Sequence, residues 1–314
     1  MPETRRSTKP KAKQDRLDSL LHMIFRAETP FGVLEDGGLA EKALQDNNIR
    51  RIAFDFQDLD VESVRSSLEP PVLFRPVYSS VVEAHTVIPR FADPEEEKER
   101  TGFRDYDPPS DPVRMEEERY WIWGPEKCAR RVTTYLKRWA FHFSRHNYNW
   151  TWLLDSQLRK IYIPNPFFGI YVQGAKHGSE WTNEWLHEYE KPDGKGVYPH
   201  VVAIELHSRN GNNDSILLGE LSTIIQAIYN RVNQVKVNEK GEEIWPRQYE
   251  FENEKRFPVL TISLFGPQHG RILYACLDGE ALVIRQSPIY SFEKRDTAPW
   301  DFFMRMLLSF PVEE

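Results

Sequence analysis

Residues 201–232 read VVAIELHSRNGNNDSILLGELSTIIQAIYNRV, and this stretch decides the fold. It begins with VVAIEL, a β-branched and apolar run typical of a strand buried on both faces. Asn213 or Asp214 is then placed to cap a helix, because apolar side chains recur with a helical period from there to Asn233. The stretch therefore predicts a central strand followed by an amphipathic helix.

The chain after this helix predicts a return to the sheet. The Asp278-Gly279 pair is a strong hairpin signal between two apolar runs, and a closing helix is expected near Pro299. A strand, a helix and a strand in succession favour a right-handed parallel crossover over 201–265. The expected strands cover 258–265, 271–277 and 281–286.

A long helix is expected upstream, from Gly124 to about His146. Pro125 suits its first position, and its apolar stripe includes Trp139. Together these elements predict an α/β (α+β) protein with a mixed central sheet flanked by helices. The remaining expected elements are helices from Asp15 and over 39–44 and 179–189, and strands over 51–56, 77–88, 150–154, 160–163 and 167–172.

Changes in composition divide the chain into four segments. Prolines and a mixed charge run at 89–112 are typical of a linker or long loop. Residues 1–14 are rich in Lys and Arg, which favours a disordered, solvated tail over a nuclear-import signal or a polyanion-binding arm. The predicted segments are a basic tail (1–14), an N-terminal portion of helices and strands (15–88), the linker (89–112) and a main α/β domain (113–314).

Composition limits the compartment and the partners. The net charge of −7 argues against a broadly cationic surface for nucleic acid, although a local basic groove is compatible with it. Cys128 and Cys276 are far apart, as expected of free thiols in a reducing compartment. No apolar run approaches the roughly 18 residues of a membrane span. We expect a cytoplasmic or nuclear protein whose partner is an unknown protein or small-molecule ligand, not a membrane.

Three acidic or imidazole side chains are candidates for catalysis. Glu205 and His207 lie two apart on the predicted central strand, so they share a face, and Glu220 in the next helix could approach them. Such groups could hold a divalent cation or position a water molecule. Alternatively, Glu205 and His207 are a polar strand end, and Glu220 complements the helix dipole.

A further acidic residue extends this candidate site. Asp155 ends the predicted strand WTWLLD and could act as a metal ligand together with Glu205. Alternatively, Asp155 only forms the turn, since Asp is a common turn residue. Both interpretations stay open.

The turn between two apolar strands carries a possible ligand-binding set. Gln268, His269 and Arg271 combine an amide, an imidazole and a guanidinium, and Arg271 could clamp an anionic group. The alternative is a solvated hairpin turn. The aromatic clusters at 120–123, 148–152 and 181–185 could likewise stack a planar ligand or bases, or form packing contacts.

Three stretches resemble a family of uncharacterised filamentous-fungal proteins. They are YNWTWLLDSQLRKIYIPNPFFGIY (148–171), the 201–232 stretch, and FPVLTISLFGPQHGRILYACLDGEALVIRQSPIY (257–290). The resemblance covers most of residues 145–310. Since that family has no established activity, the resemblance implies no site.

A second resemblance concerns the fold. A strand ending in Glu-x-polar, an amphipathic helix, a strand and an Asp-Gly hairpin are similar to the back half of the restriction-endonuclease-like PD-(D/E)XK superfamily. The resemblance implies that Glu205 binds Mg²⁺ or Mn²⁺, that His207 takes the place of the motif lysine, and that Asp155 is the upstream Asp. The His-for-Lys exchange and the distance to Asp155 point to a degenerate relative.

The favoured function is therefore a non-enzymatic binding or accessory protein on a nuclease-like α/β scaffold. One alternative is a metal-dependent phosphodiesterase or nuclease using Mg²⁺ or Mn²⁺. Another is an accessory protein in fungal specialised metabolism. The residues leave open whether the protein is an enzyme.

Overall fold

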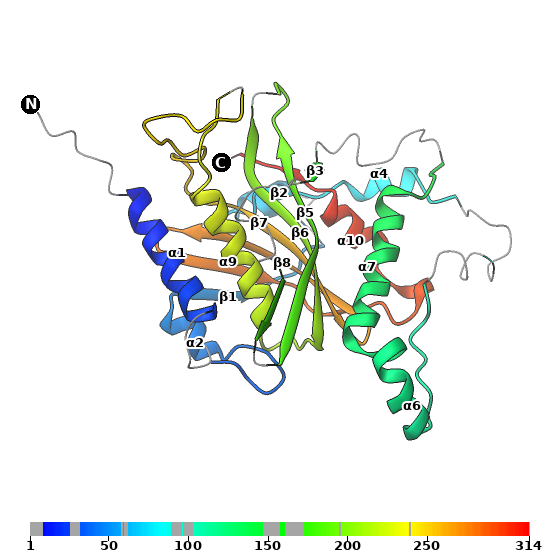
Figure 1. Ribbon diagram of the computed structural model, residues 1–314. Coiled ribbons are helices and arrows are strands. Elements are labelled where there is room, and N and C mark those ends of the chain that lie inside the picture. The colour runs from blue at the N-terminus through cyan, green and yellow to red at the C-terminus, as the bar shows by residue number, and fades with distance from the viewer. Residues whose placement is uncertain are drawn as a thin grey trace, which may run out of the picture.

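The computed structural model describes residues 9–25, 32–57, 59, 62–88, 96, 103–146, 158–160, 173–176, 178–194, 196–238 and 240–313. Within this part, helices flank a mixed sheet of nine strands, which confirms the predicted α/β class (Figure 1). In chain order the strands are β1 (Ile49–Ala53), β3 (Leu158–Lys160), β4 (Gln173–Lys176), β5 (Ser179–Glu190), β6 (Val197–Asn210), β7 (Val259–Gly266), β8 (His269–Asp278), β9 (Ala281–Gln286) and β10 (Tyr290–Ser291). Their order across the sheet is β1-β9-β8-β7-β6-β5-β3, with β4 paired to β5 and β10 to β8.

A second, smaller sheet and the helices complete the fold. A separate two-stranded sheet pairs β2 (Phe74–Arg75) with β11 (Phe310–Pro311). The described helical elements are α1 (Lys9–Phe25), α2 (Glu41–Asp46), α3 (Glu62–Ser66), α4 (Ser79–Ala84), α6 (Pro112–Glu118), the π-helical η1 (Arg119–Trp123), α7 (Pro125–Phe141), α9 (Leu218–Val232), the 3-10 turn η3 (Arg295–Thr297) and α10 (Trp300–Leu307).

The predicted β6–α9–β7 unit is confirmed. Strands β6 and β7 pair in parallel, with Ile204 opposite Ile262, as a crossover through a helix requires. The predicted β8–β9 hairpin is also confirmed, and Gly279 at its turn has a φ of +62°, a value that glycine adopts without strain. Helix α10 begins next to Pro299 as predicted, and α7 begins at the predicted Pro125 but ends at Phe141, before the predicted end near His146.

Two hydrophobic cores cover the two faces of the sheet. Val202, Ile204 and Leu206 of β6 pack in the core that contains α7 and α10. Val201 packs on the opposite face, in the core that contains α1 and α9. Figure 1 shows α1 and α9 on one side of the strands and α7 and α10 on the other. Because strand side chains alternate, the odd-numbered residues of β6 face α9.

The helix predicted over 179–189 is wrong. These residues form β5, which pairs antiparallel with β6 along most of its length. The side chains of Ser179, Trp181, His187 and Tyr189 are buried at alternate positions, which is the two-residue period of a strand. Long-range pairing therefore overrides a local composition that permits a helix.

Two boundaries and one further element also differ from prediction. The strand predicted over 77–88 is wrong, because α4 forms there and buries Val82. Helix α1 begins at Lys9 and not at Asp15. Neither Asn213 nor Asp214 caps α9, because the helix begins later, at Leu218, and Leu217 takes the N-cap position.

Several predictions fall where the structure gives no description. The predicted strands over 150–154 and 167–172, most of the 89–112 linker and residues 1–8 lie outside the described residues. In the part that is described, no helix has both the length and the apolar character needed to cross a bilayer.

We expect Gly219→Ala to destabilise the fold. In most helices a Gly→Ala change raises the free energy of unfolding by about 1 kcal/mol. Here the new Cβ would lie 2.7 Å from Trp181 Cβ and 2.8 Å from His207 Cε1, so we expect a loss of roughly 1–3 kcal/mol in the free energy of unfolding. Urea unfolding measures it. The matched change Gln226→Ala, at a half-buried position of the same helix, should stay within about 0.5 kcal/mol. A stabilised Gly219→Ala variant would contradict the close helix–sheet contact.

Candidate functional site

A row of polar side chains crosses four neighbouring strands beneath α9. The strand registers place Asn183 of β5 opposite Glu205, Glu205 opposite Ser263 of β7, and Ser263 opposite Arg271 of β8. Directly opposite residues lie about 5 Å apart and point to the same face. The sheet therefore presents a continuous polar row where its face meets the helix.

An ion pair between Glu220 and Arg271 closes one end of this row. Arg271 Nε donates to Glu220 Oε1 at 2.8 Å, and Arg271 Nη2 donates to Glu220 Oε2. The backbone N–H of Leu217 also donates to Oε2, at 2.7 Å. Arg271 Nη1 donates to the carbonyls of Asn212 at 2.7 Å and Ser215 at 3.0 Å. Both charged side chains are fully buried, and Arg271 is engaged by these internal partners instead of clamping an external anion.

Two opposing effects act on the Glu220 carboxyl. Burial alone raises its pKa, because a charged carboxylate is poorly solvated inside a protein. The charge and hydrogen bonds of Arg271 outweigh burial, so the pKa lies below its ordinary value. Glu220 is therefore a carboxylate held by its partner.

Glu205 and His207 occupy the other part of the row. Thr223 Oγ1 of α9 donates to Glu205 Oε1 at 2.8 Å, and Asn183 Nδ2 donates to Thr223 Oγ1 at 2.9 Å. His207 Nε2 lies 3.6 Å from Glu205 Oε1. The exposed fractions of Glu205 and His207 are 0% and 3%, so neither side chain reaches solvent.

Four of the predicted site residues thus come together: Glu205, His207, Glu220 and Arg271. They form a buried helix–sheet contact in which Glu220 pairs with Arg271 and Glu205 accepts a hydrogen bond from Thr223, while Glu205 Oε2 and His207 Nε2 are buried without a hydrogen bond. Among the residues that the structure describes, no three acidic, His or Cys side chains are grouped to hold a metal ion. Asp155, the remaining predicted ligand, lies outside the described residues.

Gln268 and His269 do not join this group. Gln268 is buried, accepts a hydrogen bond from Arg131 of α7 at 2.8 Å, and donates to the Phe292 carbonyl at 2.9 Å. His269 Nε2 lies 3.5 Å from Glu293 Oε1, and burial lowers its pKa more than Glu293 raises it. Gln268 therefore braces α7 against the turn.

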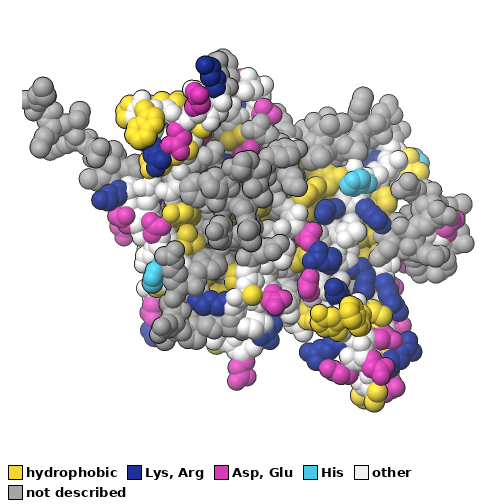
Figure 2. Space-filling model, in the orientation of Figure 1, with side chains coloured by type: hydrophobic (Ala, Val, Ile, Leu, Met, Phe, Trp, Pro, Cys, Tyr) yellow, Lys and Arg dark blue, Asp and Glu magenta, His cyan; other side chains and the backbone are white. Residues whose placement is uncertain are grey.

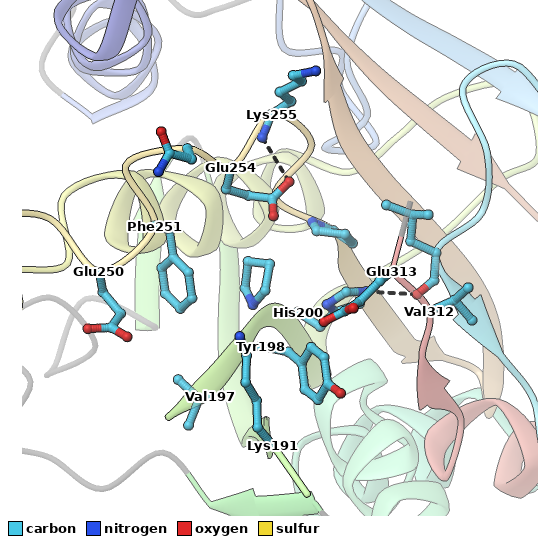
Figure 3. A pocket seen from close by; sticks show the side chains of 14 residues that line it. Lys191, Val197, Tyr198, His200, Glu250, Phe251, Glu254, Lys255, Val312 and Glu313 are labelled. Carbon is cyan, nitrogen blue, oxygen red and sulfur yellow. Dashed lines mark hydrogen bonds between the residues drawn. The ribbon is translucent and has the colours of Figure 1, made fainter. Parts of the chain in front are cut away.

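A pocket with a volume of about 440 Å³ opens where β6 meets the segment before β7. Glu250, Phe251 and Glu254 line one side, and Tyr198 and His200 of β6 line another (Figure 3). Burial lowers the pKa of His200 to about 4, and its Nε2 lies 2.8 Å from the Leu73 carbonyl. At neutral pH this imidazole is thus uncharged and held by the backbone.

A second pocket, of about 540 Å³, lies between α7 and α10. Its walls include Tyr135, Trp139, Trp300 and Phe302. The Tyr135 and Trp139 rings are stacked with centroids 6.0 Å apart, and the Trp300 ring centroid lies 4.6 Å from that of Tyr135. We call it the Trp139 pocket.

Polar groups fix the indoles of the Trp139 pocket. Trp139 Nε1 donates to Asp301 Oδ1 at 2.8 Å, and Trp300 Nε1 donates to the Arg295 carbonyl at 2.8 Å. Aromatic walls with a few placed polar groups are typical of small-molecule sites. Sequence reasoning missed this pocket, because Trp139 fits the apolar stripe of its helix. Nothing in the sequence around Trp300 and Asp301 indicates that they contact Trp139.

Searches against protein-family models, curated protein sequences and solved structures found no match to this chain. The resemblances to a fungal family and to the PD-(D/E)XK superfamily therefore stay predictions.

We expect Arg271→Met to remove about 3–5 kcal/mol from the free energy of unfolding at pH 7, because it leaves the Glu220 carboxylate buried without its cation. The folded-state pKa of Glu220 is lowered, so the pair stabilises the wild type above the unfolded pKa of about 4.3 and is lost as the pH falls through the folded value. The deficit of the variant should therefore shrink in acid. Urea unfolding at pH 7 and below pH 4 measures both effects.

Arg50→Met is the matched control. It breaks the exposed ion pair between Arg50 and Asp278, whose side chains are 51% and 38% exposed. We expect a loss under about 1 kcal/mol from it. Equal losses in the two variants would contradict the special role of the buried pair.

Proposed function

We propose that this chain is a non-enzymatic binding protein. The observation that carries the proposal is the burial of Glu205, Glu220 and Arg271, each 0% exposed beneath α9. A general acid, base or metal ligand has to reach its substrate, whereas Glu220 and Arg271 are bonded to each other and to the backbone, and Glu205 accepts a hydrogen bond from Thr223. Their arrangement supports a role in holding the helix on the sheet.

The Trp139 pocket is the site that best suits a ligand. Its volume of about 540 Å³ falls in the range of small-molecule sites. The partly exposed rings of Trp139 and Phe302 offer apolar surface, and hydrogen bonds hold Trp139 and Trp300 in place before a ligand arrives. Such preorganisation lowers the entropy cost of binding.

The polar groups of the pocket favour a ligand with a hydrogen-bond donor. Asp301 accepts from Trp139 through Oδ1, and a carboxylate has a second oxygen that also accepts. Arg295 lies 3.2 Å from Asp296, so these two charges offset each other at the rim. We therefore infer a planar, largely apolar ligand that carries an N–H or O–H group.

We expect 3-aminoquinoline, a planar ring with an amino donor, to bind and to release heat in isothermal titration calorimetry. Trp139→Ala should weaken binding about tenfold, because it removes one wall of the pocket and the group that orients Asp301. Trp245→Ala is the control, since Trp245 is 79% exposed and is not part of this pocket. Equal affinity of the wild type and Trp139→Ala would exclude this site.

The nuclease alternative makes an opposite prediction. We expect no heat on titration with Mg²⁺ or Mn²⁺, and no cleavage of DNA or RNA in their presence, because Glu205 is fully buried. Glu205→Gln, which keeps the size of the side chain, tests the assignment. Metal-dependent cleavage by the wild type that this variant lacks would overturn the binding proposal.

A further inference from the structure

The outer face of α7 is cationic. From Lys127 to Arg138, every side chain that is not buried carries a positive charge, except Thr134. Figure 2 shows Lys and Arg side chains gathered over this helix. Although the chain as a whole has a net charge of −7, positive charge is concentrated on this helix. Four of these cations, Lys127, Arg130, Lys137 and Arg138, make up the cationic face, whereas Arg131 donates to the buried Gln268 side chain and to the Ile122 carbonyl.

The charges on this face are only partly neutralised. Arg130 pairs with Glu126 at 2.9 Å and Glu184 at 2.5 Å. Lys127 and Lys137 form no ion pair with any carboxylate in the described part of the chain. A patch with this excess of cations attracts polyanions. Binding is favourable because the cations displace the counterions that are condensed on the polyanion.

Exposed aromatic rings adjoin the cationic face. Tyr120 and Trp121 are each 72% exposed on η1, the π-helical segment directly before α7. Their rings meet edge to face with centroids 4.8 Å apart. Figure 2 shows a hydrophobic patch beside the Lys and Arg side chains at the junction of α6 and α7. Large exposed aromatics are costly in water unless a partner covers them, and short π-helical segments are frequent at functional sites.

We propose that the outer face of α7 and the Tyr120–Trp121 pair bind single-stranded nucleic acid. The cations of α7 contact the phosphates, and unpaired bases stack on the two rings, the combination by which proteins hold single strands without reading sequence. A duplex suits the surface less well, because its bases are already stacked and paired. The inference is independent of the Trp139 pocket, whose rings lie on the inner side of α7.

Fluorescence anisotropy with labelled dT and U oligonucleotides of twelve nucleotides tests this inference on the full chain. We expect binding that weakens as salt rises. Lys127→Gln with Lys137→Gln should lower the salt slope by about 1.4, since each phosphate contact on a single strand contributes about 0.7, and should weaken binding about 25-fold at 0.1 M salt. Trp121→Ala should weaken binding by about fivefold or more and leave the slope unchanged.

Controls separate this surface from other sources of binding. Lys240→Gln removes an exposed lysine from a distant loop and should change nothing. Arg5→Gln with Arg6→Gln tests the basic N-terminal tail. Circular dichroism establishes that each variant is folded. The proposal is overturned if the oligonucleotides do not bind, if the tail variant loses binding while the α7 variants keep it, if a duplex of equal length binds more tightly, or if only poly-glutamate binds.

Discussion

The buried ion pair between Glu220 and Arg271 is the constraint on which the rest of the structure depends. It ties the first turn of α9 to β8, a strand that follows only after a long excursion of the chain. An ion pair without solvent is stable only when every remaining donor and acceptor is satisfied. Here Leu217, Asn212 and Ser215 supply those partners, so the loop before the helix is fixed together with the helix.

This constraint gives the two faces of the sheet different characters. The face beneath α9 carries buried charged and hydroxyl groups, among them the Glu220–Arg271 ion pair and the hydrogen bond from Thr223 to Glu205. The face beneath α7 and α10 is built from aliphatic and aromatic side chains, and the open Trp139 pocket lies there. The features suited to a partner, namely that pocket and the cationic side of α7, thus gather on the half of the molecule without the polar network.

Sequence reasoning predicted the elements whose periodicity was strong, and it failed where long-range pairing decided. Strand β6, helix α9 and the β8–β9 hairpin were predictable, since each shows a regular apolar pattern. Strand β5 was not, because its Trp, Glu and His residues permit a helix until β6 lies beside them. The approach of Glu205 to His207 followed from their shared strand face. That Arg271 would neutralise Glu220 could not be predicted, because the contact joins residues 51 positions apart.

The position of β1 has a consequence for the integrity of the molecule. This strand comes from the N-terminal part of the chain, yet it covers the outer side of β9, whose six residues are all buried. If Ile49–Ala53 detached, the backbone groups of β9 would become an open template onto which a neighbouring molecule could add a strand. The charged residues Arg50 and Arg51 discourage such addition at β1 itself. Pairing with β1 therefore keeps the hydrogen-bonding edge of β9 from being exposed.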